Sequence, residues 1–191
     1  MENINLTGQF LIAMPAMTDP YFSKTIIYVC THNQDGAMGV IVNRATDITL
    51  NDLFEQIKLD SDSSALLEKT VYYGGPVQID RGFILHTPQI EYNSTILVNN
   101  TIALTTSKDV LEATAKDNGP EKMLVALGYA GWTPGQLEEE MLKNAWLSLD
   151  THNIHNIHAL IFDAPNTEKF DLAMQLMGLN LANLSHNAGH A

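Results

Sequence analysis

The chain has 191 residues, of which 45% are hydrophobic and 17% charged, and its formal net charge is −12 at pH 7. This length suits one domain spanning residues 1–191, and the composition excludes a disordered chain. The 10 Lys and Arg residues lie at least six positions apart in the sequence. They therefore form no cationic cluster of the kind that binds DNA phosphates or an anionic membrane surface.

Cysteine content and apolar runs bear on the cellular compartment. Cys30 is the only cysteine, which excludes an internal disulfide and fits a reducing compartment. The first five residues lack the basic region of a signal peptide. The apolar runs at 11–17 and 123–130 are shorter than the roughly 20 residues that a membrane helix needs. We therefore expect a cytoplasmic protein.

The first half of the chain is mainly strand-like. A short apolar run at 9–14 ends at Pro15, and the β-branched and aromatic residues at 25–31 predict a buried strand. The turn sequence at 33–36 makes 38–42 the returning strand of a hairpin. Leu50, Leu53, Phe54 and Ile57 have helical spacing, and Thr49 with Asp52 forms a capping pattern before them.

Strands and helices are interspersed in the remainder. Further strands are predicted at 71–73, 82–86, 95–98, 102–105, 123–130 and 146–149. Helices are predicted from a Thr106 or Ser107 cap through Lys116, from 133–135 through Lys143, and at 167–177, whereas 159–162 fits either state. The tail at 185–191 is small, polar and expected to be loose. Without regular βαβ alternation, this order predicts an α+β fold with a mainly antiparallel or mixed sheet.

The hairpin from Cys30 to Arg44 concentrates reactive side-chain types. Cys30 and His32 project from the same face of a strand, so a neighbouring imidazolium could lower the pKa of the thiol. The alternative is an inert core thiol, which is the common state of a free cysteine. Arg44 and Arg81 are the only arginines; together they could bind an anion, or each could anchor a loop by bonding backbone carbonyls.

Other motifs point to chemistry less clearly. The glycines at 36–39 have the G-x-x-G spacing of a KH loop but not its basic flanks, and they do not form a Walker A loop. Those at 128–131 lack the dinucleotide-binding spacing, so tight turns and close packing are favoured for both. His152, His155 and His158 lack the clear ligand pattern of a zinc site, and we expect neither metal nor cofactor. The acids at 138–140 could act as acid and base, but adjacent helical positions diverge by about 100°, which favours a solvated face.

Taken together and in order, these segments resemble the bacterial YqgE/AlgH family. The resemblance runs from about Gly8 to the C-terminus and is carried by several motifs: Leu11-Ile12-Ala13-Met14-Pro15, Asp19-Pro20-Tyr21-Phe22, His32 with Gly36-Ala37-Met38-Gly39 and Asn43-Arg44, Gly74-Gly75-Pro76-Val77, Arg81-Gly82-Phe83 with His86, Thr106-Ser107-Lys108-Asp109, Gly128-Tyr129-Ala130-Gly131-Trp132, Gly135-Gln136-Leu137-Glu138 and Asn144-Ala145-Trp146-Leu147.

The resemblance implies a fold but no reaction. The implied fold is α+β, with a bifurcated sheet partly closed into a small barrel and surrounded by helices. A cytosolic bacterial location is also implied. One branch of the family, AlgH, is associated with transcriptional regulation of exopolysaccharide production. Because this chain is acidic, we expect any regulation to be indirect, without direct DNA binding.

Two functional hypotheses follow from the motif residues. The first is a non-catalytic binding or regulatory protein that recognises a protein partner or a small anionic ligand. Its candidate site comprises six residues: Asp19, His32, Asn43, Arg44, Arg81 and His86. The alternative is an enzyme with His32 or His86 as general base and the arginines holding an anionic substrate, or a redox sensor based on Cys30.

Overall fold

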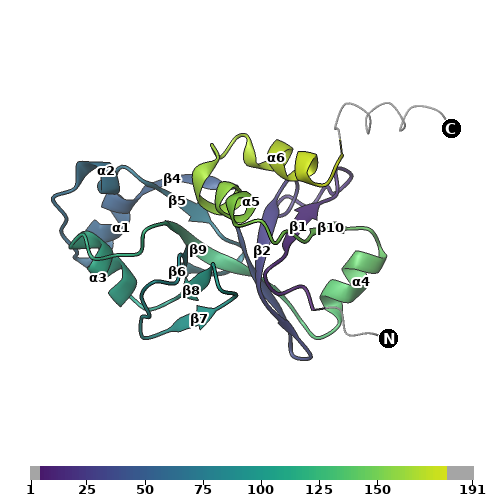
Figure 1. The fold of residues 1–191 in the computed structure, drawn as a ribbon, viewed down its shortest axis with the longest axis horizontal. Coiled ribbons are helices and arrows are strands. Elements are labelled where there is room, and N and C mark those ends of the chain that lie inside the picture. Colours follow the sequence, from purple (N-terminus) through teal and green to yellow (C-terminus); the bar gives the residue numbers. More distant parts are fainter. Residues whose placement is uncertain (1–4, 180–191) are drawn as a thin grey trace.

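The computed structural model describes residues 5–179 (Figure 1). Its strands are β1 (Phe10–Ala13), β2 (Ile26–Asn33), β3 (Gly36–Ile41), β4 (Ala45–Thr49), β5 (Thr70–Tyr73), β6 (Val77–His86), β7 (Thr95–Leu97), β8 (Ala103–Thr105), β9 (Met123–Trp132) and β10 (Trp146–Leu149). Its helices are α1 (Leu50–Ile57), α2 (Ser64–Leu67), α3 (Asp109–Ala115), α4 (Gln136–Leu142), α5 (Ile154–His158) and α6 (Lys169–Leu176), with a π-helical turn, η1 (Ala159–Asp163), after α5.

The strands form one curled sheet, which confirms the predicted α+β class. Its order is β10-β1-β2-β3-β9-β6-β8-β7, and each neighbouring pair is antiparallel. In the part of the chain that the structure describes, β10 and β7 are the two ends of this path, so the sheet is an open half-barrel. The closed barrel that the family resemblance implied is not shown.

The sheet forks at β9, where β5 enters between β3 and β9. β3 pairs with the last residues of β9, at 130–132, whereas β5 runs parallel to β9 at 126–127. Gly74 joins the two branches: its amide donates to the Leu127 carbonyl (2.8 Å), and its carbonyl accepts from the Ile41 amide (2.9 Å). β4 then pairs with the outer edge of β5. The bifurcation is therefore built by backbone hydrogen bonds around one glycine.

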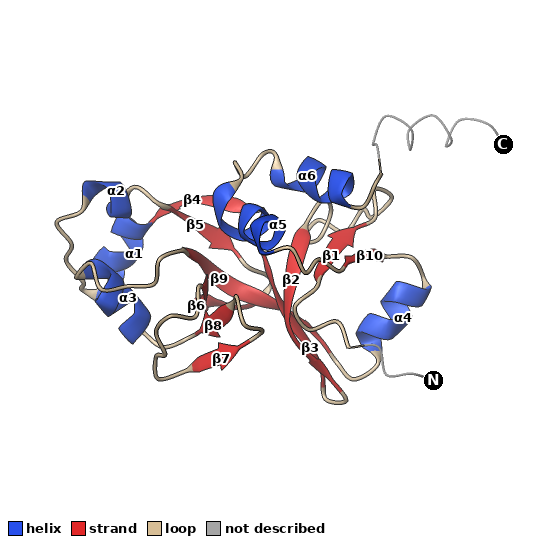
Figure 2. Cartoon of the chain, viewed as in Figure 1, coloured by secondary structure: helices blue, strands red, loops and turns tan. Residues whose placement is uncertain are grey.

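Helices cover both faces of the sheet, so the first five residues of β2 are buried on both sides. In Figure 2, α5 and α6 lie beside β2, α4 lies near the N-terminal end of the described chain, and α1–α3 gather at the far end. Ile26, Tyr28 and Cys30 of β2 face a core completed by α5, η1 and α6. Ile27 and Val29 face a second core with α4. A third core lies under α1, α2 and α3.

The observed N-caps of α1 and α3 can be compared with the caps predicted from the sequence. α1 begins as predicted, with a complete capping box: the Asp52 amide donates to the Thr49 hydroxyl (3.3 Å), and the Thr49 amide donates to the Asp52 carboxylate (2.8 Å). The predicted cap of α3 is wrong. The N-cap is Lys108, and the Ser107 hydroxyl instead donates to Asp109 and accepts from the Ser94 amide.

Two other sequence predictions are settled by the structure. α4 begins at Gln136, after a left-handed Gly135, so Pro134 precedes the helix instead of lying in its first turn. The ambiguous segment 159–162 is helical and belongs to η1. The predicted loose tail at 185–191 lies outside the described residues. No helix within residues 5–179 is long and apolar enough to cross a membrane.

Cys30 lies inside the central core and is 1% exposed. Burial without a cationic neighbour raises the pKa of its thiol to about 12. His32 does not lower it, because the β-bulge between Val29 and Thr31 interrupts the regular alternation of β2 and the imidazole bonds elsewhere. The geometry therefore favours the inert core thiol over the redox sensor.

Lys169 is a buried cation that the sequence patterns did not single out. Its side chain starts from α6, is 1% exposed, and donates from Nζ to the carbonyls of Val42 (2.9 Å) and Ile161 (2.8 Å). The ammonium also lies 5.0 Å from the centroid of the Tyr72 ring. Burial lowers the pKa of Lys169 to about 8, and Asp163 partly opposes that shift. Lys169 therefore connects α6 to η1 through the Ile161 carbonyl and to the chain just after β3 through the Val42 carbonyl.

Cys30 is expected to resist thiol reagents in the folded protein. With its pKa near 12, the thiolate fraction at pH 8 is on the order of 10⁻⁴, and the core excludes the reagent. Ellman's reagent should therefore label the native protein no faster than it unfolds, while urea-unfolded protein should release one thiol equivalent per chain. Rapid native labelling would revive the sensor hypothesis.

Lys169 is expected to make stability rise with alkaline pH. The folded state loses this proton near pH 8 and the unfolded chain near 10.5, so between these values the unfolded state binds more protons. The unfolding free energy of the wild type, relative to Lys169→Met, should increase by up to about 3 kcal/mol from pH 7 to 10.5. Urea titrations at several pH values measure this difference. Lys116→Met, at an exposed lysine, should run parallel to the wild type; a parallel Lys169→Met profile would contradict the prediction.

Candidate functional site

Three of the six predicted site residues hold one loop, at 19–24, against the start of β2. The Asp19 carboxylate accepts from the amides of Tyr21 (2.8 Å) and Phe22 (3.2 Å). The Asn43 side chain accepts from the Ile26 amide (2.8 Å) and donates to the Lys24 carbonyl (2.9 Å). These contacts fix a sharp bend, which ends with Lys24 at a φ of 56°.

Arg44 binds the same loop through the loop's backbone carbonyls. Its guanidinium donates to the carbonyls of Pro20 (3.2 Å), Tyr21 (2.5 Å) and Ser23 (3.1 Å). It also lies 6.0 Å from the centroid of the Tyr73 ring. Among the alternatives for the arginines, this is the loop anchor that bonds backbone carbonyls. We call Asp19, Asn43 and Arg44 the loop clasp.

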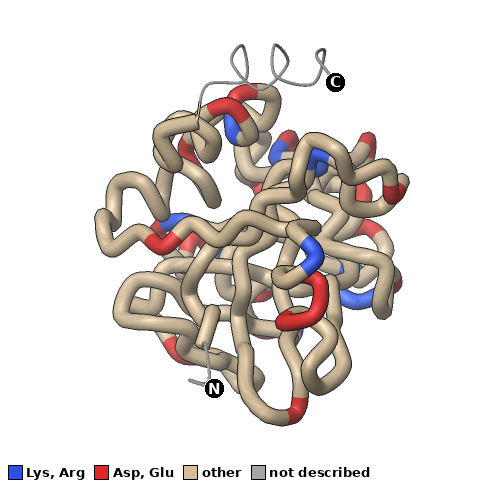
Figure 3. Tube along the Cα trace, turned by 90° about the vertical axis from the view of Figure 1, so that its right-hand side faces the viewer, with Lys and Arg blue, Asp and Glu red and all other residues tan. Residues whose placement is uncertain are grey.

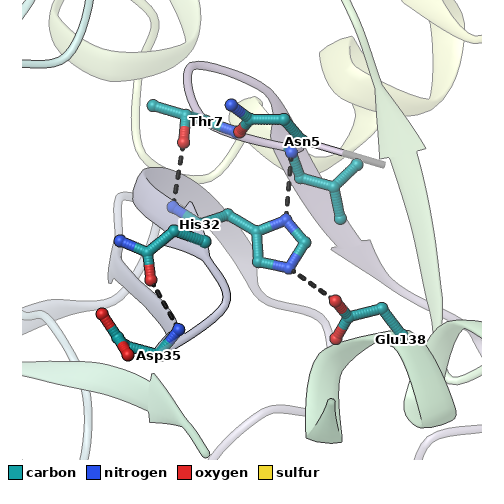
Figure 4. Close-up of polar contacts among 7 residues, drawn as sticks. Asn5, Thr7, His32, Asp35 and Glu138 are labelled. Atoms are coloured by element: carbon teal, nitrogen blue, oxygen red, sulfur yellow. Dashed lines mark hydrogen bonds and ion pairs between the residues drawn. The ribbon is translucent and has the colours of Figure 1, made fainter. Parts of the chain in front are cut away.

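His32 attaches the N-terminal segment to the β2–β3 hairpin and to α4 (Figure 4). Its Nδ1 accepts from the Leu6 amide (3.1 Å), and its own amide donates to the Thr7 hydroxyl (2.9 Å). Because Nδ1 is an acceptor, the neutral ring carries its proton on Nε2, which donates to the Glu138 carboxylate (3.1 Å). The side chain is 3% exposed, and both ring nitrogens are occupied.

Arg81 and His86 lie on β6, in different surroundings. Arg81 is exposed and donates to the Gln78 amide oxygen (3.5 Å) and the Thr106 hydroxyl (3.2 Å). His86 is fully buried: Nδ1 donates to the Thr87 carbonyl (2.8 Å), and Nε2 accepts from the Thr105 hydroxyl (2.8 Å). Burial lowers the pKa of His86, so this imidazole stays neutral.

The six predicted residues therefore occupy four separate places: the loop clasp, His32, Arg81 and His86. The loop clasp lies at the start of β2 and His32 near its end, and an eight-residue strand separates such positions by roughly 20 Å. His86 is opposite Met123 at the start of β9, whereas the His32 partner Ala37 is opposite Trp132 at its end. The ends of this ten-residue strand lie roughly 30 Å apart. Arg44, Arg81, His32 and His86 do not converge on one anion.

Glu138 and Glu139 are exposed, as the predicted solvated face requires, but Glu138 and the half-buried Glu140 also bond to neighbours. Glu138 accepts from His32, and one oxygen of Glu140 accepts from the indole N–H groups of Trp132 (2.9 Å) and Trp146 (2.8 Å). Adjacent acids on a helix do diverge, as predicted, but the divergence directs them to different partners. The helix lies between the two motif segments that contain Trp132 and Trp146, and this order was the sequence signal that could have indicated the contact.

A groove of about 510 Å³ lies beside this pinned hairpin. We call it the hairpin groove: it is lined by 31–38 of the β2–β3 hairpin, by 129–134 at the end of β9, and by Val77. Gly36 has a φ of 121°, and a methyl group there would overlap the Trp132 carbonyl, so the two walls approach at backbone distance. Two motifs that the sequence singled out thus meet in space and form one concave surface.

The β6 bulge that follows Val77, a residue of the groove lining, carries exposed apolar side chains. β6 pairs with β9 at Val77 and again at Gly82, and residues 78–81 between these points bulge outward, with Gln78 at a φ of 51°. Val77 is 36% and Ile79 60% exposed. Arg81 ends the same bulge, so a cationic group lies next to two apolar ones.

Charge and metal chemistry add little to this site. Lys and Arg are few and separated in Figure 3, in keeping with the net charge of −12. Within residues 5–179, no group of three His, Cys, Asp or Glu residues is close enough to hold a metal ion. His152 is exposed before α5, whereas His155 and His158 lie within it.

Comparison with known proteins identifies the family. The AlgH-like family model matches residues 10–182. Over the full length of both chains, a UPF0301 protein of Thiobacillus denitrificans is 53% identical and one of Nitrosospira multiformis is 47% identical.

Solved structures agree with this assignment. The solution structure of the AlgH protein from Pseudomonas aeruginosa is 43% identical, with a TM-score of 0.79, and the match covers 100% of this chain and 98% of that one. A crystal structure of a Corynebacterium diphtheriae protein, 20% identical with a TM-score of 0.66, shares the fold over 93% of this chain and 88% of that one. The family resemblance is confirmed: this chain belongs to the AlgH-like family.

Proposed function

We propose that this chain is a non-catalytic binding protein whose hairpin groove receives a segment of a protein partner. The observation that carries the proposal is the groove itself, formed where the hairpin meets the end of β9 and lined by Val77, with the exposed Ile79 on the β6 bulge that follows Val77. Exposed apolar groups beside a concave surface are typical of protein interaction sites. The partner segment would place apolar side chains in the groove and an acidic group against Arg81.

The occupied polar groups support binding over catalysis. Both nitrogens of His32 and both of His86 have hydrogen-bond partners within the protein, so neither imidazole is free to accept a substrate proton. Arg44 is committed to three carbonyls of one loop. In this proposal, His32 holds the hairpin that forms one wall of the groove, whereas the loop clasp holds a loop at the other end of β2, and neither contacts the partner.

A regulatory role would act through that partner. The chain carries a net charge of −12 and no clustered cations, so affinity for DNA phosphates is not expected. An acidic protein with an apolar groove regulates most simply by altering the activity of another protein. We therefore propose indirect regulation.

Capture experiments on the groove rim test the binding function. The double variant Val77→Ser with Ile79→Ser should lose the proteins that wild type retains from a native lysate, because truncating a central apolar anchor costs about 1–2 kcal/mol or more, roughly tenfold in affinity. Leu142→Ser is the matched control, since Leu142 is 84% exposed but lies on α4 outside the groove lining. Identical protein lists from wild type and the double variant would overturn the proposal.

Substitutions of the two arginines are expected to have different effects: Arg44→Ala should lower stability, and Arg81→Ala should weaken partner binding. Arg44→Ala removes three charged hydrogen bonds and should lower the unfolding free energy by about 1–3 kcal/mol, or several degrees in Tm. Arg81→Ala removes exposed contacts and should change stability by less than about 0.5 kcal/mol, while weakening partner capture. Thermal unfolding and capture on both variants measure this; equal destabilisation would argue against a clasp specific to Arg44.

A further inference from the structure

A second cavity lies away from the hairpin groove, between β5, β9 and the π-helical turn η1. It has a volume of about 240 Å³, and we call it the β5 cavity. Six of its nine lining residues are apolar: Leu50, Met123, Leu124, Val125, Ile161 and Phe162. An engineered protein cavity of about 150 Å³ with similar walls binds benzene, so this volume admits a ring with a substituent.

The polar part of the wall comes from one segment, Lys69, Thr70 and Tyr72. Thr70 and Tyr72 project from the same face of β5, because side chains repeat every two residues along a strand. Among the interactions within residues 5–179, no hydrogen bond or ion pair engages the Lys69 ammonium, the Thr70 hydroxyl or the Tyr72 hydroxyl. These groups thus supply one cation and two hydroxyls at an otherwise apolar cavity.

The electrostatics of this cavity differ from those of the rest of the chain. Its wall contains no Asp or Glu, although the protein has a net charge of −12. The buried Lys169 ammonium lies behind the wall, 5.0 Å from the Tyr72 ring, and has no carboxylate within ion-pair distance in the described chain. The nearest acid, Asp163, is paired with Lys122 at 2.6 Å. Two lysines therefore flank the cavity, and an anion suits it.

The π-helical turn shapes the cavity and joins it to Lys169. Ile161 and Phe162 of η1 contribute their side chains to the wall, while the Ile161 carbonyl accepts from the Lys169 ammonium. Single π-helical turns occur frequently at functional sites. Here the turn lets one short segment present apolar side chains to the cavity and a backbone carbonyl to the buried cation.

We propose that the β5 cavity binds a small organic monocarboxylate with an apolar body. The body packs against the aliphatic and aromatic wall, and the carboxylate accepts hydrogen bonds from Thr70 and Tyr72 and faces the Lys69 ammonium. A neutral or cationic ligand of the same shape would leave the ammonium without an anion. This site is independent of the hairpin groove, so the proposed partner binding and this ligand binding stand or fall separately.

Benzoate is the probe that tests the proposal, with benzyl alcohol and benzylammonium as charge controls of similar shape. In ¹H–¹⁵N NMR titrations of the full chain, benzoate should bind saturably with a Kd on the order of 1 mM or below. The shifted amides should belong to 69–73, 123–125 and 159–163. Benzyl alcohol should bind about tenfold more weakly, and benzylammonium should not saturate.

Variants of the cavity residues test which polar side chains contact the benzoate carboxylate. Lys69→Met retains the methylene stem and should weaken benzoate about 3- to 10-fold, as should Tyr72→Phe. Lys116→Met, at an exposed lysine elsewhere, should leave the Kd unchanged. The spectrum of each variant reports whether it is folded. Absence of saturation, equal affinity for all three probes, or shifts confined to the hairpin groove would overturn the proposal.

Discussion

The architecture depends on a backbone-to-backbone contact at the fork of the sheet. Gly74 and Gly75 lie against Gly128 and Tyr129 of β9 so closely that a methyl group on any of the three glycines would overlap the opposing backbone. Gly128 and Gly75 also have positive φ values, which side-chain-bearing residues adopt at a cost. With this contact in place, β5 fits between β3 and β9, and the curled sheet can expose different surfaces on its two branches.

The two proposed sites lie on either side of this fork. The hairpin groove forms where β3 meets the last residues of β9, and the β5 cavity forms where β5 runs along the first half of the same strand. β9 thus positions both. A ten-residue central strand paired on both edges is a rigid support, because its backbone groups are satisfied along most of its length.

Many of the family's motif residues hold chain segments together. Asp19, Asn43 and Arg44 fix one loop, and His32 pins the N-terminal segment through its ring and its amide. The His32 ring bonds a buried amide, that of Leu6, and such a side chain is costly to replace because the abandoned amide keeps its desolvation cost. A motif rich in His, Asn and Arg can therefore have a structural role, holding chain segments in place, as well as a role in binding or catalysis.

The sequence by itself determined the α+β class, most strands, the β2–β3 hairpin and the capped start of α1, because these depend on neighbours a few residues apart. Only the tertiary structure decided which polar residues meet. The partner of His32 on α4 is 106 positions away, and Lys169 bonds a carbonyl 127 positions away. Periodicity and spacing carry no information at such separations. The sheet's fork and curl set those distances, and so they separated the six predicted site residues and created the groove and the cavity.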